Sequence, residues 1–234
     1  MNRYLPITVL VLLGAAGCVN ASDENADENA NVTAKDGGDI HSVNGSIHVP
    51  TGVKRGDVGT VNGSIRVDDD AAVSEAHTVN GDIRVGARAT SESLKTVNGS
   101  ITVGAGARVT EKVTTVNGSL TLRDAAQIGG AVTTVNGSIT LAAAHVAAGI
   151  ETVNGDITVG SNSRVEGGIL MRKPHYSLFH WEGSSPRVVI GPGANVQGNL
   201  RFEREVRLYV SDRASIGPVI GATAVRFSGD SPPG

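Results

Sequence analysis

Acidic side chains and histidines are the residues of this 234-residue chain that could carry out acid–base or metal chemistry. Asp82 and Asp156 each follow an Asn-Gly pair, but four repeats separate them, about 19 Å in a parallel β-stack and too far for paired catalysis. The acidic run at 68–70 could hold a cation or form a solvated turn. His175 and His180 have no carboxylate or cysteine at metal-site spacing. We therefore expect no enzyme, no catalytic residue, no metal and no cofactor.

One repeated motif sets the elements that position these residues. Residues 60–65 read Thr-Val-Asn-Gly-Ser-Ile, and the motif returns along two thirds of the chain with Ser or Asp in the fifth place. Its asparagines are 18, 18, 18, 19, 19 and 18 residues apart. A constant short period indicates stacked structural repeats. The asparagines are Asn44, Asn62, Asn80, Asn98, Asn117, Asn136 and Asn154.

Each repeat contains three short apolar patches separated by Gly, Ala and Asp. In one coil the apolar residues are Val61, Ile65, Val67, Val73 and Ala76. Alternation of apolar and polar residues over three or four positions is typical of β-strands. We therefore predict an all-β, single-stranded parallel β-helix (a β-solenoid), roughly triangular, with 18–19 residues per coil. Right-handed winding is expected by analogy with parallel β crossovers.

The two 19-residue coils must place one extra residue outside the strands. A one-residue shift inside a strand would turn every following side chain to the other face. We expect the extra residue at the corner ahead of the third strand. Aromatic residues are only 3% of the chain, so the core of such a stack must consist of small aliphatic side chains.

An outward-facing row is expected between the Ile and Val of each Ile-x-Val patch. No carboxylate pair stacks in this row, which disfavours a polysaccharide-cleaving site. Regular threonine hydroxyls could order water, as in ice binding, but Arg and His interrupt them. The row consists of His48, Arg66, Arg84, Thr102, Thr121, Thr140 and Thr158.

The Asn-Gly pairs favour a structural role. Gly tolerates positive φ and Asn tolerates the left-handed region, so the pair is expected to make a tight corner. Stacked asparagines can also hydrogen-bond amide to amide as a ladder. A row of ligand-binding amides is the functional alternative. Asn-Gly also favours type I′ hairpins, so an antiparallel meander is the alternative fold, although a meander does not require constant spacing.

The repeated Val-Asn-Gly-Asp/Ser-Ile-x-Val of about residues 39–170 resembles a bacterial adhesin-like β-solenoid family of unknown function. This resemblance implies exposure outside the cytoplasm and assigns no active residue. The Gly-Pro-Gly-Ala-x-Val-x-Gly-x-Leu pattern within residues 186–227 is similar to bactofilins, which are polymerising triangular β-helices. That similarity implies two or three further coils at 188–230, before a tail at 231–234, and allows end-to-end self-association.

The first 17 residues have the form of a secretory signal peptide. A basic residue precedes a short apolar run and the small residues 14–17, directly before the only cysteine, Cys18. This arrangement resembles a bacterial lipoprotein signal, which implies cleavage before Cys18 and lipidation of its sulfur; an ordinary signal peptide is the alternative. Val19 follows, and by resemblance to Gram-negative lipoproteins the absence of Asp there implies the outer membrane. Residues 18–38 are expected to be a disordered acidic tether behind the lipid.

An aromatic segment at 171–187 interrupts the period and is predicted to be a loop insertion. Its aromatics could cover the solenoid flank, or they could form a binding loop for a glycan or protein. The candidate binding residues are His175, Tyr176, Phe179, His180 and Trp181.

These features favour a non-enzymatic, lipid-anchored envelope protein that acts as a structural or adhesin-like binding module. Its expected partners are a membrane, through the lipid, and an unidentified protein or glycan. A net charge of −3 argues against nucleic acid. A self-assembling bactofilin-like scaffold is the second hypothesis, and a β-helix enzyme acting on polysaccharide is the third.

Overall fold

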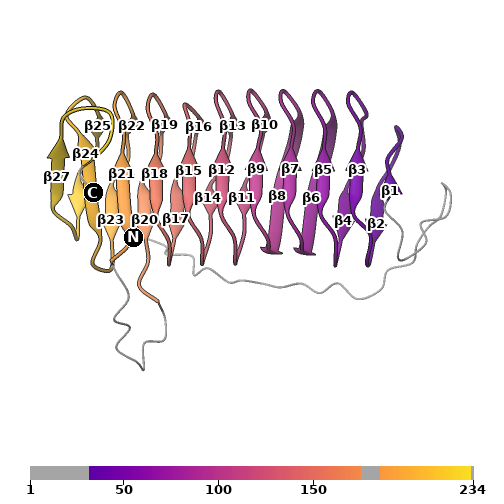
Figure 1. Ribbon diagram of the computed structural model, residues 1–234, viewed down its shortest axis with the longest axis horizontal. Helices are drawn as coiled ribbons and strands as arrows, with labels where there is room; N and C mark the ends of the chain where they lie inside the picture. The colour runs from indigo at the N-terminus through magenta and orange to yellow at the C-terminus, as the bar shows by residue number, and fades with distance from the viewer. Residues whose placement is uncertain (1–31, 175–184, 233–234) are drawn as a thin grey trace, which may run out of the picture.

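This computed structural model describes residues 32–174 and 185–232. Every strand pairing in it is parallel and joins neighbouring coils. The strands form a rod in which β1 lies at one end and β27 at the other (Figure 1). The predicted all-β solenoid is confirmed, and the antiparallel meander is excluded. None of these residues forms a helix long and apolar enough to cross a membrane.

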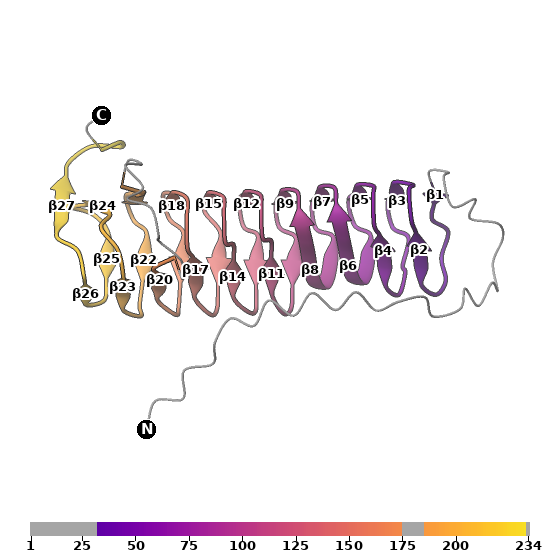
Figure 2. The same cartoon turned by 90° about the horizontal axis from the view of Figure 1, so that it is seen from below.

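One strand of each coil belongs to an eleven-stranded sheet, here called sheet A, which runs the length of the rod (Figure 2). At about 4.8 Å between strands, this sheet is roughly 50 Å long. Its strands are β1 (Val32–Thr33), β3 (Ile47–Val49), β5 (Ile65–Val67), β7 (Ile83–Val85), β9 (Ile101–Val103), β12 (Leu120–Leu122), β15 (Ile139–Leu141), β18 (Ile157–Val159), β21 (Arg187–Ile190), β24 (Arg207–Ser211) and β27 (Ala224–Phe227).

The remaining strands form a sixteen-stranded sheet, here called sheet C. From β9 onward most coils contribute two short strands to it, so that three strands and three corners complete a turn. The second strands of the coils are β10 (Arg108–Val109), β13 (Gln127–Ile128), β16 (His145–Val146), β19 (Arg164–Val165), β22 (Asn195–Val196) and β25 (Ser215–Ile216). The third strands are β2 (Ile40–Ser42), β4 (Val58–Thr60), β11 (Val113–Thr114), β14 (Val132–Thr133), β17 (Ile150–Thr152), β20 (Ile169–Met171), β23 (Leu200–Phe202) and β26 (Val219–Ile220).

Two coils lack the corner between their second and third strands. There the chain runs straight through β6 (Ala72–Asn80) and β8 (Thr90–Asn98). Val109 pairs with Ser91, 18 residues back, whereas Val113 pairs with Leu94, 19 residues back. The first extra residue therefore lies between Val109 and Val113, at the corner ahead of the third strand, as predicted.

The core consists of stacked aliphatic side chains with almost no aromatic ring. The inward Ile and Val of each sheet A strand are fully buried; Ile101 and Val103, for example, are 1% and 0% exposed. Phe202 and Phe227, near the C-terminal end, are the buried aromatics of the described chain. Small side chains at every level let successive coils repeat the same packing.

In the repeated motif Thr faces the core and Val faces outward, whereas the apolar pattern predicted Val in the core. Val61, predicted among the apolar core positions, is 41% exposed, whereas Thr60 is 3% exposed. The Thr60 hydroxyl donates to the carbonyl oxygen of Gly45 in the preceding coil at 2.9 Å. Since this bond satisfies the hydroxyl inside the rod, Thr can occupy the inner face and the next residue must face outward.

Most of the positive-φ residues lie elsewhere than predicted. None of the seven ladder asparagines has a positive φ, and of the glycines that follow them only Gly137 and Gly155 do. Left-handed residues instead follow the sheet A strands, two or three positions after each strand ends. They are Gly52, Asp70, Arg88, Gly106, Ala125, Ala143, Asn162 and Gly193.

Glycine is required after the asparagine because backbones approach closely there. A Cβ on Gly99 would lie 1.9 Å from the carbonyl oxygen of Gly81, and one on Gly118 would lie 1.9 Å from that of Gly99. Neither glycine has a positive φ. Steric exclusion between coils, rather than turn conformation, therefore explains most of these glycines.

The ordered stack extends beyond the expected limits of the Asn-Gly region. Val32 of β1 pairs with Ile47, and Ala34 is buried, so part of the expected 18–38 tether is the first strand of sheet A. After the aromatic segment, Val188 pairs with Ile157 and the stack resumes without a change of face. The C-terminal strands therefore continue the same rod.

Candidate functional site

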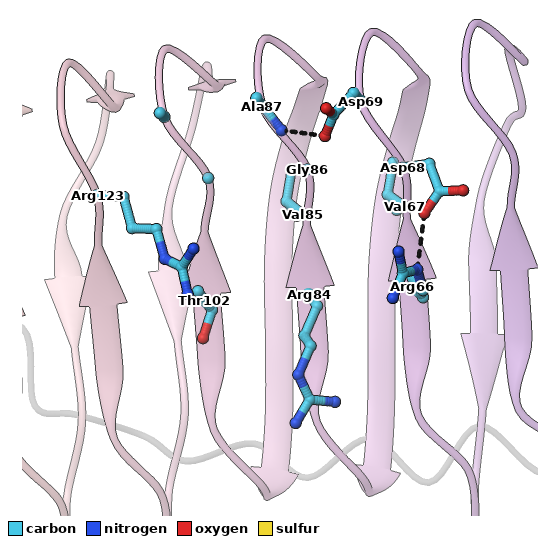
Figure 3. Close-up of a pocket in the computed structure, with 12 residues that line it drawn as sticks. Arg66, Val67, Asp68, Asp69, Arg84, Val85, Gly86, Ala87, Thr102 and Arg123 are labelled. Atoms are coloured by element: carbon cyan, nitrogen blue, oxygen red, sulfur yellow. Dashed lines mark hydrogen bonds and ion pairs between the residues drawn. The ribbon is translucent and has the colours of Figure 1, made fainter.

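A shallow depression of about 380 Å³ crosses four coils beside sheet A (Figure 3). Arg66, Arg84 and Thr102 reach it from the outward positions of β5, β7 and β9, because the middle residue of each Ile-x-Val strand faces away from the core. Arg123 reaches it from the corner after β12. Four residues from four successive coils thus face one surface.

The three guanidinium groups differ in their partners. Arg66 Nε lies 2.7 Å from an Asp68 carboxylate oxygen, and an Arg84 nitrogen lies 2.8 Å from Asp82. The Arg123 side chain points toward Thr102 (Figure 3) and has no hydrogen bond or ion pair to the described parts of the chain. The guanidinium group of Arg123 is therefore available to form hydrogen bonds with a ligand.

Small residues form the floor of the depression. A Cβ on Gly86 would lie 2.6 Å from the Asp68 backbone, and one on Gly104 would lie 2.6 Å from the Gly86 backbone. Asp69 accepts a hydrogen bond from the Ala87 amide at 2.7 Å, which holds this acidic side chain against the corner. The coil backbones therefore pack closely here, and Gly86 and Gly104 carry no side chain between the arginines.

The acidic corner at 68–70 is occupied by internal ion pairs. Burial raises the pKa of Asp68, but hydrogen bonds from His48 and Arg66 outweigh it and lower that pKa overall. His48 Nε2 lies 2.6 Å from the Asp68 carboxylate. The hydrogen bond from Arg88 lowers the pKa of Asp70. These carboxylates hold neighbouring coils together rather than forming an open cation site.

The asparagines form a continuous hydrogen-bonded ladder on the outside of the rod. From Asn62 onward, each Nδ2 donates to the carboxamide oxygen of the asparagine one coil earlier, at 2.8–3.0 Å. The ladder ends at Asn154, whose carboxamide oxygen accepts a bond from Arg204 at 2.6 Å. Because each carboxamide hydrogen-bonds to the next one along the row, the main role of these side chains is to stabilise the stack.

The other predicted positions do not come together as a site. Asp82 accepts the Ser100 amide at 2.9 Å and Asp156 accepts the Arg187 amide at 2.8 Å, so each stabilises the next coil. Cys18 lies outside the described residues. So do the predicted binding-loop residues His175, Tyr176, Phe179, His180 and Trp181.

Sequence reasoning found the outward row that contains Arg66, Arg84 and Thr102 but did not connect it with Arg123. Only the three-dimensional stack places a corner residue of one coil beside a strand residue of the preceding coil. Within residues 32–174 and 185–232 no group of three or more His, Cys, Asp or Glu side chains is arranged to hold a metal ion. No protein-family model, curated protein or solved structure matches the chain.

Proposed function

We propose that this chain is a lipid-anchored β-solenoid of the bacterial envelope that acts as a non-enzymatic binding module. The observation that supports this proposal best is the depression in which Arg66, Arg84, Arg123 and Thr102 gather from four coils over a floor of small residues. A straight parallel sheet repeats its side chains at a constant rise, so the surface suits an extended ligand better than a compact one.

The chemistry of the depression favours an anionic polysaccharide as that ligand. Guanidinium groups bind carboxylates through two parallel hydrogen bonds, and Arg123 has this capacity available. The Arg66 and Arg84 side chains are 69% and 59% exposed, so their ion pairs with Asp68 and Asp82 contribute little stability and the guanidinium groups can turn to a ligand. The Thr102 hydroxyl can donate to, or accept from, a sugar hydroxyl.

Binding to immobilised acidic polysaccharides, with a neutral polysaccharide as reference, tests this proposal. The variant Arg66→Ala/Arg84→Ala/Arg123→Ala is expected to lose at least about tenfold in affinity, equivalent to the loss of one charged hydrogen bond. The matched control is Arg108→Ala/Arg164→Ala/Arg213→Ala, which removes the same charge from residues outside the depression. Equal losses in both variants would reduce the interaction to non-specific charge attraction, and no binding by the parent would reject this ligand class.

The anchoring part of the proposal rests on Cys18 and the apolar leader before it. A lipidated cysteine would tether the rod to a membrane, and a second signal or chain is usual for stable attachment. Growth with a radiolabelled fatty acid is expected to label the parent protein and not Cys18→Ser. A parent protein without label would contradict the lipid anchor.

The ends of the rod favour end-to-end assembly as a second candidate function. β27 is the last strand of sheet A, and the nearby apolar side chains of Ile220 and Val225 are 49% and 50% exposed. An uncovered parallel edge is a template for pairing with another strand. Sedimentation and negative-stain microscopy across concentration distinguish the two functions. Filaments or end-to-end oligomers would support the scaffold, whereas a monodisperse rod about 50 Å long would support the binding module.

A further inference from the structure

Two histidines on sheet C lie in one row with a glycine between them. His41 of β2 pairs with Gly59 of β4, and Gly59 pairs with His77 of β6. Strands two positions apart are about 9.6 Å apart, yet the two imidazole ring centroids are only 5.8 Å apart. The rings therefore lean toward each other across the position where Gly59 has no side chain.

Gly59 leaves a notch that faces one nitrogen of each ring. An ideal Cβ on this glycine would lie 2.4 Å from His77 Nε2 and 2.7 Å from His41 Nδ1. The two nitrogens are thus no more than 5.1 Å apart, the sum of those distances. The ring planes are tilted by 43°, and one ion between the rings requires the two nitrogens to come within about 4 Å of each other by side-chain rotation.

Three carboxylates lie beside the histidines in the adjacent row, and Lys95 of β8 pairs with His77 on the following coil. Asp39, Asp57 and Glu75 precede His41, Gly59 and His77 by two residues, so they form the adjacent row on the same coils. Asp39 accepts the Asp57 amide at 2.8 Å, and Asp57 accepts the Glu75 amide at 3.3 Å. These bonds hold a row of negative charge next to the notch, where it attracts a cation.

We infer that His41 and His77 bind one divalent transition-metal ion over Gly59, with water completing the coordination. Imidazole nitrogen is a ligand for Zn²⁺, Ni²⁺ and Cu²⁺, and a site built from nitrogen and oxygen donors binds Cu²⁺ most tightly among them. The inference requires only two protein ligands, so it agrees with the absence of three-ligand groups in the described chain. It is independent of the polysaccharide proposal, since sheet C carries it.

Two other histidines provide matched controls. His48 and His145 are each paired with a carboxylate, Asp68 and Glu166 respectively. Neither has a second imidazole in contact with it among residues 32–174 and 185–232. Removing both changes the histidine count as much as removing the proposed ligands, without touching the notch.

The test is a Cu²⁺ titration of the full-length chain with Cys18→Ser, purified without a polyhistidine tag, followed by electron paramagnetic resonance and calorimetry. One ion per chain with hyperfine coupling to two imidazole nitrogens is expected. His41→Ala and His77→Ala should each weaken binding by more than the about tenfold to 100-fold that accompanies loss of an outer-shell partner. His41 is exposed, so its replacement leaves the core intact.

A second variant tests the geometry while keeping both ligands. Gly59→Ala places a methyl group between the rings, which must separate, and it is expected to weaken Cu²⁺ binding as well. Gly38→Ala is the control, because a Cβ there meets no atom within 4 Å. Binding that survives His41→Ala and His77→Ala overturns the site. So does binding that depends on His48 and His145, or on His175 and His180.

Discussion

Arg204 donates from Nη1 to the carboxamide oxygen of Asn154 at 2.6 Å, across 50 residues of sequence. The same nitrogen lies 3.3 Å from the carbonyl oxygen of Val153. The last asparagine thus finds its partner beyond the aromatic segment, after the chain has returned to the stack. One side chain from a C-terminal coil therefore closes the ladder that the Asn-Gly coils build.

Arg204→Met should weaken the C-terminal coils in particular. Asn154 loses a charged, partly buried hydrogen bond, so the free energy of unfolding is expected to fall by about 1–2 kcal/mol. Urea unfolding measures the total change, and hydrogen exchange locates it near β18 to β23. Arg213→Met is the control, since its bond to Asp230 is exposed. An equal effect of both variants would contradict a closing role for Arg204.

Asn117→Asp should break the ladder at its middle. Asn117 donates to Asn98 and accepts from Asn136, both at 2.9 Å. An aspartate keeps the shape but places a carboxylate oxygen against the Asn98 oxygen, so we expect a loss of about 1–2 kcal/mol in the free energy of unfolding. Asn199→Asp introduces the same charge outside the ladder. If chemical denaturation gives the same midpoint for both variants, the ladder contributes no stability.

Gly99→Ala should be among the most damaging single changes. The added Cβ would lie 1.9 Å from the Gly81 carbonyl oxygen, and two backbones would have to separate. A loss of about 3 kcal/mol or more is expected. Gly38→Ala should leave the thermal midpoint unchanged, because open space surrounds that position. A thermal midpoint for Gly99→Ala close to that of the parent would contradict the steric explanation.

Thr96→Val tests the inward threonine. Thr96 is 1% exposed, and its hydroxyl donates to the Gly81 carbonyl oxygen at 3.0 Å. Valine has the same shape but no donor, so a loss of about 1 kcal/mol is expected from urea unfolding. Thr102→Val on the outward row should change stability by less than about 0.5 kcal/mol. The reverse order would mean that the two faces had been assigned incorrectly.

His77 should make stability depend on pH. Burial lowers the pKa of His77, and the charge of His41 lowers it further, while Glu75 and Asp57 oppose the shift and Lys95 adds to it. The unfolded chain therefore binds the proton more readily than the folded chain. The stabilising contribution is present above the unfolded pKa of about 6.5 and is lost as pH falls through the lower folded pKa.

The measurement is the free energy of unfolding between pH about 7.5 and about 5, in the parent and in His77→Gln. The variant should show a flatter decline on acidification, and a histidine NMR titration should assign the lowered pKa to His77. His145→Gln serves as the control. If the free energy of unfolding of His77→Gln depended on pH as steeply as that of the parent, the prediction would be wrong.

The sequence predicted the stack because spacing alone determines which residues lie above one another. The equivalence of Asn98 and Asn117 and the position of the extra residue before Val113 follow from that spacing. Hydropathy failed for Val61, because it ignores the backbone acceptor that makes a buried Thr60 favourable. The left-handed corner was missed because its residue type changes from coil to coil: Gly106 and Asn162 favour positive φ, whereas Ala125 and Ala143 do not.

The candidate surfaces were harder to predict than the fold. His41 and His77 are two coils apart in sequence, and their contact depends on the missing side chain of Gly59. Arg123 reaches the depression only because side chains at corners extend over neighbouring coils. His41 and His77 share a column of the repeat, but not with adjacent coils, whereas Arg123 and Thr102 differ in both column and coil, so neither relationship follows from comparing one coil with the next.

The ladder also bears on how such a gene can change. Each asparagine within the ladder donates a hydrogen bond to the asparagine of the preceding coil and accepts one from the asparagine of the following coil. Asn62, for instance, donates to Asn44 and accepts from Asn80. An in-frame duplication of 18 codons would therefore insert a coil whose two new interfaces already exist elsewhere in the rod. Length can evolve in whole coils, about 4.8 Å at a time, while both ends keep their neighbours.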